Sequence, residues 1–451
     1  MTAQPTDVIL HAFDWPYEMI CARADSIAAC GYRSVLISPP MKSFKHPCGT
    51  PWWQRYQPQD YRVIDNQLGN KESLSAMIDR LREVGVRVYA DVVFNHMANE
   101  SKWRNDLIYP NCRDLRSYQQ DNDYYQRQQL FGNLNEPLFS EKDFVAEFGI
   151  RDWKDKWQVQ NGRITGGPHD RGLPTLKDSP YVIEQQKAFL LALKALGVKG
   201  FRIDAAKHLT LNHIKQVWSD ELVQGMHIFG EIITDGGATK QEYQLFLQPY
   251  LAETQLSAYD FPLFQTLFNA MGEHGNLATL VDPYCFGEAL SKERAVTFAI
   301  THDIPNNQVF RNLIMTEQQE ALAYTYLLGR DGGVPLIYSD LNTSGVVNSN
   351  GQPRWLNQWN HHDITGKIDF HNRMHGLAMH TLVAEEEFLV FAREKQGLVA
   401  MNKSSSEREF SFATKQNWVD LLSGESFSPA GNGMLTFSVA AQQSRMLCLT
   451  I

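Results

Sequence analysis

The chain has 451 residues, of which 43% are hydrophobic and 21% are charged, and its formal net charge is −9. This length predicts two or three domains, and no apolar run approaches the roughly 18 to 20 residues of a membrane span. The negative charge argues against a nucleic-acid-binding protein, for which a basic face is expected. The six cysteines contain no CxxC pair, so neither a zinc site nor a disulfide framework is indicated.

The first residues, Met-Thr-Ala-Gln-Pro-Thr-Asp, lack the basic and apolar regions of a signal peptide. A cytoplasmic protein is therefore expected, unless a leader has been removed.

Short apolar runs alternate with helical segments along most of the chain. Helices are indicated at residues 17–30, 72–84 and 182–196. Strands are expected at residues 8–13, 34–38, 86–94, 198–203, 226–231, 256–259, 295–300 and 334–338. Such alternation implies parallel strands joined by crossover helices, and eight units fit a (β/α)8 barrel. The alternative is a doubly wound open sheet, which would need a glycine-rich phosphate turn that the sequence lacks.

Two segments interrupt this pattern and predict further domains. Residues 97–180 are polar and aromatic, with several short possible strands, and we expect a domain inserted after the third barrel strand. Residues 385–451 contain short β-type runs separated by turns, which predicts an antiparallel β-sandwich. The barrel would then comprise residues 1–96 and 181–384. Strands of the sandwich are expected at 388–392, 398–401, 410–412, 434–439 and 446–451.

Charged groups interrupt the apolar runs where four of the predicted barrel strands end. Active sites of such barrels lie at the carboxyl ends of the strands, so these groups should meet at one rim. The third strand ends at Asn95 and His96, the fourth at Arg202 and Asp204, the fifth at Glu231, and the seventh at His302 and Asp303, while Lys207 and His208 follow the fourth strand closely.

Three converging carboxylates, those of Asp204, Glu231 and Asp303, have few uses. They suit a metal site, retaining glycoside hydrolysis by a nucleophile and a separate acid/base, or structural ion pairs. Asp204 alone also suits a helix N-cap. A magnesium-dependent enzyme of the enolase type would require lysines on the strands, and only Lys207, which lies after a strand, is near.

The sequence resembles the α-amylase family, glycoside hydrolase family 13, over essentially its whole length. DVVFNH, GFRIDAAKH, FGE and FAITHD resemble the four short conserved regions of that family in order and spacing. Residues 51–58, PWWQRYQP, resemble the aromatic active-site segment of α-amylases, including the animal type. The predicted inserted segment and the C-terminal β-domain also match the family.

The resemblance implies a role for each of these residues. Asp204 would be the nucleophile, Glu231 the general acid/base, and Asp303 a stabiliser of the transition state. Arg202 should favour the ionised form of Asp204, and neighbouring acids should keep Glu231 protonated. The substrate-binding residues would be Trp52, Trp53, Tyr56, Gln57, His96, Arg202, Lys207, His208, Ile233 and His302. Core packing remains the alternative for the two tryptophans and for His96 and His302.

The sequence departs from the family at two ion sites. Many α-amylases bind a structural calcium through residues that match Asn95, the His208 carbonyl and an acid in a segment LPDLD. The matching segment here is LPTLK, in which Lys177 stands at the acidic position and could itself occupy the cation site. Asp178 is the alternative ligand, and we expect no calcium. Thr301 replaces the asparagine of the animal chloride site, so chloride dependence is not expected either.

We therefore expect a retaining α-glucan hydrolase, most simply an α-amylase that cuts internal α-1,4 bonds of starch, glycogen or malto-oligosaccharides without a cofactor. The alternatives are a transglycosylase or exo-acting member of the family, and a non-catalytic carbohydrate-binding protein. A monomer without nucleic-acid or membrane partners is expected. The run His361-His362-Asp363 resembles a metal motif, but no third ligand is in sight and we expect it at the surface.

Overall fold

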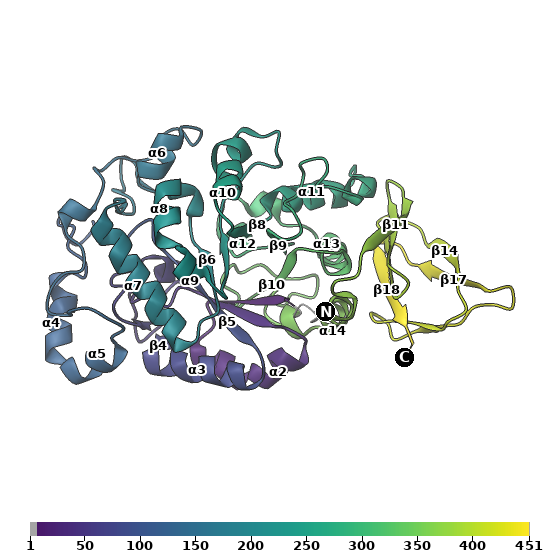
Figure 1. Cartoon of the computed structure of the whole chain (residues 1–451), viewed down its shortest axis with the longest axis horizontal. Coiled ribbons are helices and arrows are strands. Elements are labelled where there is room, and N and C mark those ends of the chain that lie inside the picture. The colour runs from purple at the N-terminus through teal and green to yellow at the C-terminus, as the bar shows by residue number, and fades with distance from the viewer. Residues whose placement is uncertain (1–6, 451) are drawn as a thin grey trace.

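The structure is a computed structural model that describes residues 7–450. The molecule is elongated (Figure 1). The parallel strands occupy its middle, helices α4 (Cys112–Gln120) and α5 (Asn122–Gln128) lie at one end, and an antiparallel β-structure made by the last part of the chain lies at the other.

Eight parallel strands close into a barrel, which confirms the predicted (β/α)8 fold and rules out the open sheet. The strand order around the barrel is β1-β10-β9-β8-β7-β6-β5-β2. Their bounds are β1 (Ile9–Phe13), β2 (Ser34–Ile37), β5 (Arg87–Val92), β6 (Gly200–Ile203), β7 (His227–Gly230), β8 (Ser257–Tyr259), β9 (Ala295–Phe298) and β10 (Val334–Asp340). Every predicted barrel strand is present.

Helices surround the barrel, as the predicted alternation requires. They are α1 (Tyr17–Ala22), α2 (Ala24–Ala29), α3 (Lys71–Glu83), α7 (Pro180–Leu196), α8 (Leu211–Val217), α9 (Asp220–Val223), α10 (Gln248–Glu253), α11 (Phe261–Met271), α12 (Asp303–Asn306), α13 (Glu317–Gly329) and α14 (His362–Met374). The helix expected at 17–30 is two helices, because the backbone leaves the helical conformation at Arg23 (φ −96°, ψ 1°). Among residues 7–450, no helix is both long enough and apolar enough to cross a bilayer.

The segment between β5 and β6 is mainly loops and helices. Within residues 97–180, all of them described, the chain forms α4, α5 and α6 (Lys156–Asn161) but only isolated bridges in place of the short strands considered from the sequence.

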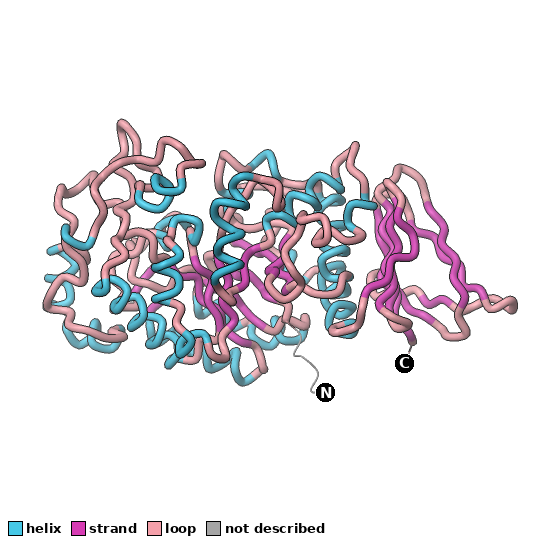
Figure 2. The backbone as a smooth tube through the Cα atoms, turned by 45° about the horizontal axis from the view of Figure 1, so that its top comes forward, coloured by secondary structure: helices cyan, strands magenta, loops and turns pink. Residues whose placement is uncertain are grey.

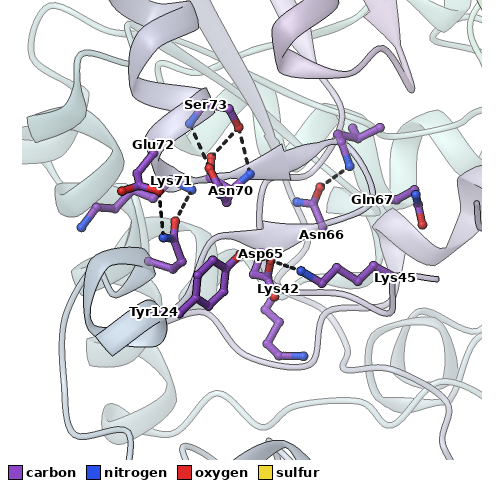
Figure 3. Close-up of polar contacts among 12 residues, drawn as sticks. Lys42, Lys45, Asp65, Asn66, Gln67, Asn70, Lys71, Glu72, Ser73 and Tyr124 are labelled. Carbon is purple, nitrogen blue, oxygen red and sulfur yellow. Dashed lines mark hydrogen bonds and ion pairs between the residues drawn. The ribbon is translucent and has the colours of Figure 1, made fainter. Parts of the chain in front are cut away.

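Polar contacts fasten this segment to the barrel near the hairpin β3 (Asp65–Asn66) and β4 (Gly69–Asn70), as Figure 3 shows. The Asp65 carboxylate accepts hydrogen bonds from Lys45 Nζ at 2.6 Å and from the Tyr124 hydroxyl of α5 at 2.8 Å. Beside it, Asn70 and Ser73 form a reciprocal capping box that begins α3.

The last part of the chain forms two antiparallel sheets, drawn in magenta at one end of Figure 2. All five predicted strands are found, but β11, β15 and β16 were not predicted, and β11 begins before residue 385. Residue 451 of the last predicted strand lies outside the described residues. The larger sheet has the order β11-β12-β13-β18-β15-β16. The bounds are β11 (Met379–Ala384), β12 (Phe388–Arg393), β13 (Gly397–Asn402), β14 (Arg408–Ala413), β15 (Trp418–Asp420), β16 (Ser426–Phe427), β17 (Met434–Val439) and β18 (Gln443–Leu449).

The larger sheet is buried on both faces. One face packs against the β14–β17 pair around Trp418 and Phe437. The other contributes Phe391, Val399 and Met446 to the same apolar core as the barrel. This second contact explains why β12 and β13 read as continuous apolar runs rather than as alternating ones.

The buried Arg393 of β12 joins this sheet to the barrel helices. Its guanidinium donates to the carbonyls of Gly329 at 2.8 Å and Arg330 at 2.9 Å, where α13 ends. It also donates to those of Met374 at 2.7 Å and Leu377 at 2.6 Å, where α14 ends. One side chain thus satisfies carbonyls that two helix ends leave unpaired.

Candidate active site

Neighbouring strands bring Asp204 and Glu231 to the same level of the barrel rim. The register pairs Ile203 at the end of β6 with Gly230 at the end of β7, and each acid is the next residue. The ladder continues through their amides, since Asp204 N–H donates to Val92 O and Glu231 N–H to Ile203 O, both at 3.0 Å. Parallel pairing alone therefore sets these two carboxylates side by side.

Arg202, which is fully buried, links three carboxylates from three strands. Its Nη1 donates to both oxygens of Asp91 at 2.9 and 2.8 Å and to Asp204 Oδ1 at 2.8 Å. Its Nη2 forms an ion pair with Glu231, although without the angles of a hydrogen bond. Asp91, also fully buried, lies on β5 and was not predicted as a site residue.

A left-handed residue fixes the loop that follows Asp204. Ala205 has φ +48° and ψ +36°, and this conformation lets its N–H donate to Glu231 Oε2 at 3.1 Å. The Lys207 N–H donates to the Glu231 carbonyl at 3.2 Å. A non-glycine residue at positive φ is uncommon, and here it positions the carboxylate of the neighbouring strand.

Burial raises the pKa of all three acids around Arg202. The pKa of Asp91 rises to about 8 and that of Asp204 to about 7, in both cases because burial outweighs the opposing effect of Arg202. Burial also raises the pKa of Glu231, and a hydrogen bond with the Asp303 side chain adds to the rise. Arg202 thus favours the ionised form of Asp204, as predicted, but does not prevent a net upward shift.

Asp303 and His302 complete the rim from the seventh barrel strand, β9. The His302 Nε2 lies 3.7 Å from Asp303 Oδ2. Burial lowers the pKa of His302 to about 3, so its ring is neutral. The ring stacks on Tyr56 at 5.2 Å between centroids and on Phe13 at 4.6 Å. The Tyr56 hydroxyl donates to Asp91 Oδ2 at 2.9 Å, which ties this aromatic group to the carboxylates.

The two adjacent tryptophans of the 51–58 segment behave differently. They lie in a 3-10 helix spanning Trp52–Tyr56. The Trp52 ring packs edge-on against Tyr56 and His302, both at 5.9 Å between centroids. The Trp53 side chain is 43% exposed. Trp52 therefore belongs to the aromatic wall of the site, whereas Trp53 is open to solvent.

His96 and Gln57 hold the segment against the barrel. The His96 Nε2 lies 3.0 Å from the Tyr56 carbonyl, and burial lowers the pKa of His96 to about 4. The Gln57 Oε1 accepts from the Asn99 N–H at 3.0 Å. Both predicted sugar ligands thus have protein contacts that position neighbouring backbone.

The remaining predicted residues, Lys207, His208 and Ile233, have separate surroundings. Lys207 Nζ pairs with Glu242 at 3.2 Å. His208 Nδ1 lies 2.8 Å from the Val159 carbonyl, and burial lowers the pKa of His208 to about 4. Ile233 lines a cavity of about 260 Å³ together with Asp303 and Glu242.

Of the residues considered for calcium, Lys177 and Asp178 are both exposed. The Lys177 ammonium donates to the Lys142 carbonyl at 2.8 Å. Asp178 is exposed and accepts a hydrogen bond from Thr210. A β-bridge instead sets Thr175 opposite His96, next to Asn95. This donor set lacks the carboxylates that calcium prefers.

The run His361-His362-Asp363 does not form a metal site in the described chain. Both histidines are exposed, as expected, and Asp363 pairs with Lys367 at 2.6 Å.

Asp91 is the site residue that the sequence interpretation missed. The available signal was an acid inside the otherwise apolar strand of the DVVFNH motif, because such a residue needs a buried cation.

Comparison with known proteins identifies the chain. A family model described as the α-amylase catalytic domain matches residues 18–325. An α-amylase of Aeromonas hydrophila is 49% identical over 415 residues, which cover 91% of this chain and 88% of that protein. The structure of α-amylase I from Eisenia fetida has a TM-score of 0.80 at 21% identity and covers 100% of this chain and 98% of that one. A point mutant of the same Eisenia fetida enzyme, solved as a maltohexaose complex, has a TM-score of 0.77 at 20% identity, with the same coverage.

A closed eight-stranded parallel barrel with adjacent carboxylates at its rim is an arrangement that barrel glycoside hydrolases use. The chain belongs to the α-amylase family, glycoside hydrolase family 13, and is an enzyme of the α-amylase type.

Proposed function

We propose that this enzyme hydrolyses internal α-1,4 bonds of starch, glycogen or malto-oligosaccharides with retention of configuration. The observation that carries the proposal is the set of acids on neighbouring strands, in which Arg202 contacts both Asp204 and Glu231. The maltohexaose bound to the Eisenia fetida mutant and the α-amylase name of the 49% identical relative support an α-glucan substrate.

In the proposed first step, Asp204 attacks the anomeric carbon of the sugar. Glu231 donates its proton to the glycosidic oxygen as the bond to the leaving sugar breaks, and a covalent glycosyl-enzyme forms. Burial, together with the nearby negative charge of Asp303, raises the pKa of Glu231, which supports its protonated state.

In the second step, water attacks the same carbon and Glu231 takes its proton. The bond to Asp204 breaks and the configuration is restored. Tyr56 and Trp52, which are partly exposed, supply flat faces on which a sugar ring can stack.

Replacement of the nucleophile and of the acid tests this assignment. Asp204→Asn and Glu231→Gln should each lower kcat on maltoheptaose by about 10³-fold or more, since both groups change bonds in the transition state. Asp79→Asn, an equivalent change at an exposed acid of α3, serves as the matched control. Full activity of Asp204→Asn would overturn the mechanism.

The products distinguish the rival functions. Proton NMR during the first turnovers should show the α-anomer, and chromatography should show several shorter malto-oligosaccharides. Products longer than maltoheptaose would indicate the transglycosylase, and release of one product size from the chain end would indicate an exo-enzyme. A wild-type protein that binds but does not cleave α-glucans would support the binding-protein alternative.

We also infer that activity does not need calcium. The exposed positions of Lys177 and Asp178 and the neutral Thr175 beside Asn95 support this. Starch hydrolysis and the thermal midpoint should be unchanged in excess EGTA relative to excess Ca²⁺. Loss of activity in EGTA that Ca²⁺ restores would contradict the inference. A chloride-free buffer tests the predicted chloride independence in the same assay.

A further inference from the structure

Three metal-ligating side chains meet at the end of the barrel opposite the carboxylates. Asp7 lies two residues before the start of β1, and His371 and His375 lie at the end of α14. The His371 Nε2 is 2.9 Å from Asp7 Oδ1, and the His375 Nδ1 is 4.0 Å from the same oxygen. One ligand atom from each residue lies within 4.8 Å of the other two. The start of the described chain beside α14 is visible in Figure 1.

Helix geometry explains why the two histidines share a face. They are four residues apart, and such residues are neighbours on a helix surface. His375 is the C-cap residue, with φ −57° and ψ 128°, and its ring meets that of His371 at 5.8 Å between centroids. Asn372 Nδ2 donates to the Gly31 carbonyl at 3.0 Å and anchors this turn to the barrel.

An ion pair explains only part of this arrangement. His371, 3% exposed, donates to Asp7 at hydrogen-bond distance, which suffices to tie α14 to the start of β1. The 4.0 Å contact of His375 is too long for a hydrogen bond. The ion pair between His371 and Asp7 therefore does not explain why the His375 ring also lies beside the Asp7 carboxylate.

We propose that Asp7, His371 and His375 form a binding site for a divalent transition metal, with Zn²⁺ as the representative ion. Two imidazoles and one carboxylate form a donor set that suits zinc, and water would complete a tetrahedral shell. Ca²⁺ prefers oxygen ligands and should not compete. His375 must approach by a small ring movement, because zinc–nitrogen bonds are about 2.0 to 2.1 Å long.

The surroundings indicate a moderate affinity. The His371 Nδ1 is buried without a hydrogen-bond partner among residues 7–450, and loss of such outer contacts costs metal sites roughly 10- to 100-fold in affinity. Arg87 places a positive charge near the site, since both Arg87 and Asp7 act on the pKa of the neighbouring His227. His227 nearby adds no charge at pH 7, because burial lowers the pKa of His227 to about 4.

The site would act on stability and not on catalysis. A metal held by Asp7 and the α14 residues would join the start of β1 to the last barrel helix, at the opposite end from Asp204. An ion that binds only the folded state raises its stability by mass action.

Zn²⁺ titration of the metal-free full-length protein tests the proposal. Calorimetry should show one equivalent bound, and excess Zn²⁺ should raise the thermal midpoint, while Ca²⁺ should do neither. His375→Ala should weaken Zn²⁺ binding at least about tenfold and abolish the midpoint shift. His380→Ala, which removes an exposed histidine on the adjacent strand β11, should bind like wild type.

His375 is the preferred target because it is partly exposed, so its loss should leave the fold intact. Circular dichroism and starch hydrolysis in the absence of metal check this. Absence of Zn²⁺ binding by the wild type, or unchanged binding by His375→Ala, would overturn the proposal. Both readouts are independent of activity, so they fail or succeed separately from the proposed hydrolysis.

Discussion

A single guanidinium, that of Arg202, faces the carboxyl groups of Asp91, Asp204 and Glu231 in a buried environment. Three acids against one cation cannot all ionise freely near neutral pH, so their protons are shared and the group titrates as a unit. The proposed chemistry uses this property, since it requires one ionised acid and one protonated acid at the same pH.

The pH dependence of hydrolysis should reveal this shared titration. Burial raises the pKa of Asp204 to about 7, so the carboxylate form that the proposed mechanism needs is lost as the pH falls through about 7. We expect kcat/KM to decline on that acidic side. Asp91→Asn removes the carboxyl group that shares Arg202 Nη1 with Asp204, which leaves this cation to Asp204 and should move the decline to lower pH by at least about half a unit.

Asp260→Asn is the matched control for the shift. Asp260 is buried too, and burial raises the pKa of Asp260 to about 6, but its carboxylate caps α11 and does not contact Arg202. Its replacement should leave the acidic limb of the profile unchanged. An acidic limb that stays fixed in Asp91→Asn, or that moves to higher pH, would contradict the shared titration.

At the residue scale, the sequence predicted the rim acids because each follows a recognisable strand. Asp91 was missed because its neighbours along β5 are mostly apolar, and the cation that pairs with it, Arg202, lies on another strand. The surroundings of Lys177 could not be predicted for a related reason. The bridge that sets Thr175 opposite His96 is a long-range backbone pairing, and no local pattern encodes its register.

At the scale of elements, Arg393 connects its own strand, β12, to two helices by hydrogen bonds to the carboxyl ends of α13 and α14. Arg393→Met would leave these buried carbonyls unpaired, and we expect a loss of about 3 to 5 kcal/mol in the free energy of unfolding. Urea denaturation measures this. Arg408→Met, which removes a partly exposed ion pair with Glu385 and a contact over the Phe388 ring, should change it by less than about 1 kcal/mol. Equal effects of the two replacements would contradict the capping role.

Element prediction succeeded where periodicity was strong. Leu74, Met77, Ile78 and Leu81 form the buried face of α3, as their spacing indicated. The break at Arg23 between α1 and α2 has no proline or glycine to signal it. Strand β11 was missed because its residue types do not follow its alternating exposure, since the polar Thr381 is half-buried and the apolar Leu382 is exposed. The two-residue strand β16 is too short for any pattern.

At the scale of the molecule, the barrel and the C-terminal sheets should unfold together. Phe391, Val399 and Met446 belong to the barrel core, so separation would expose apolar surface from both parts. Trp418 lies in the sandwich core and reports on that part alone. The difference in fluorescence between wild type and Trp418→Phe should follow the same thermal transition as far-ultraviolet circular dichroism. Two separated midpoints would contradict this coupling.

The contacts of Arg202 also bear on how this chain can change over generations. Loss of the arginine would leave three buried acids without their cation, and loss of Asp204 or Glu231 would remove a group that the proposed mechanism needs. Asp91 is the only partner whose replacement could accompany a change at Arg202 without removing a proposed reacting group. Functional relatives that lack Arg202 should therefore also carry a substitution at position 91. Variants that change position 202 alone should be removed by selection.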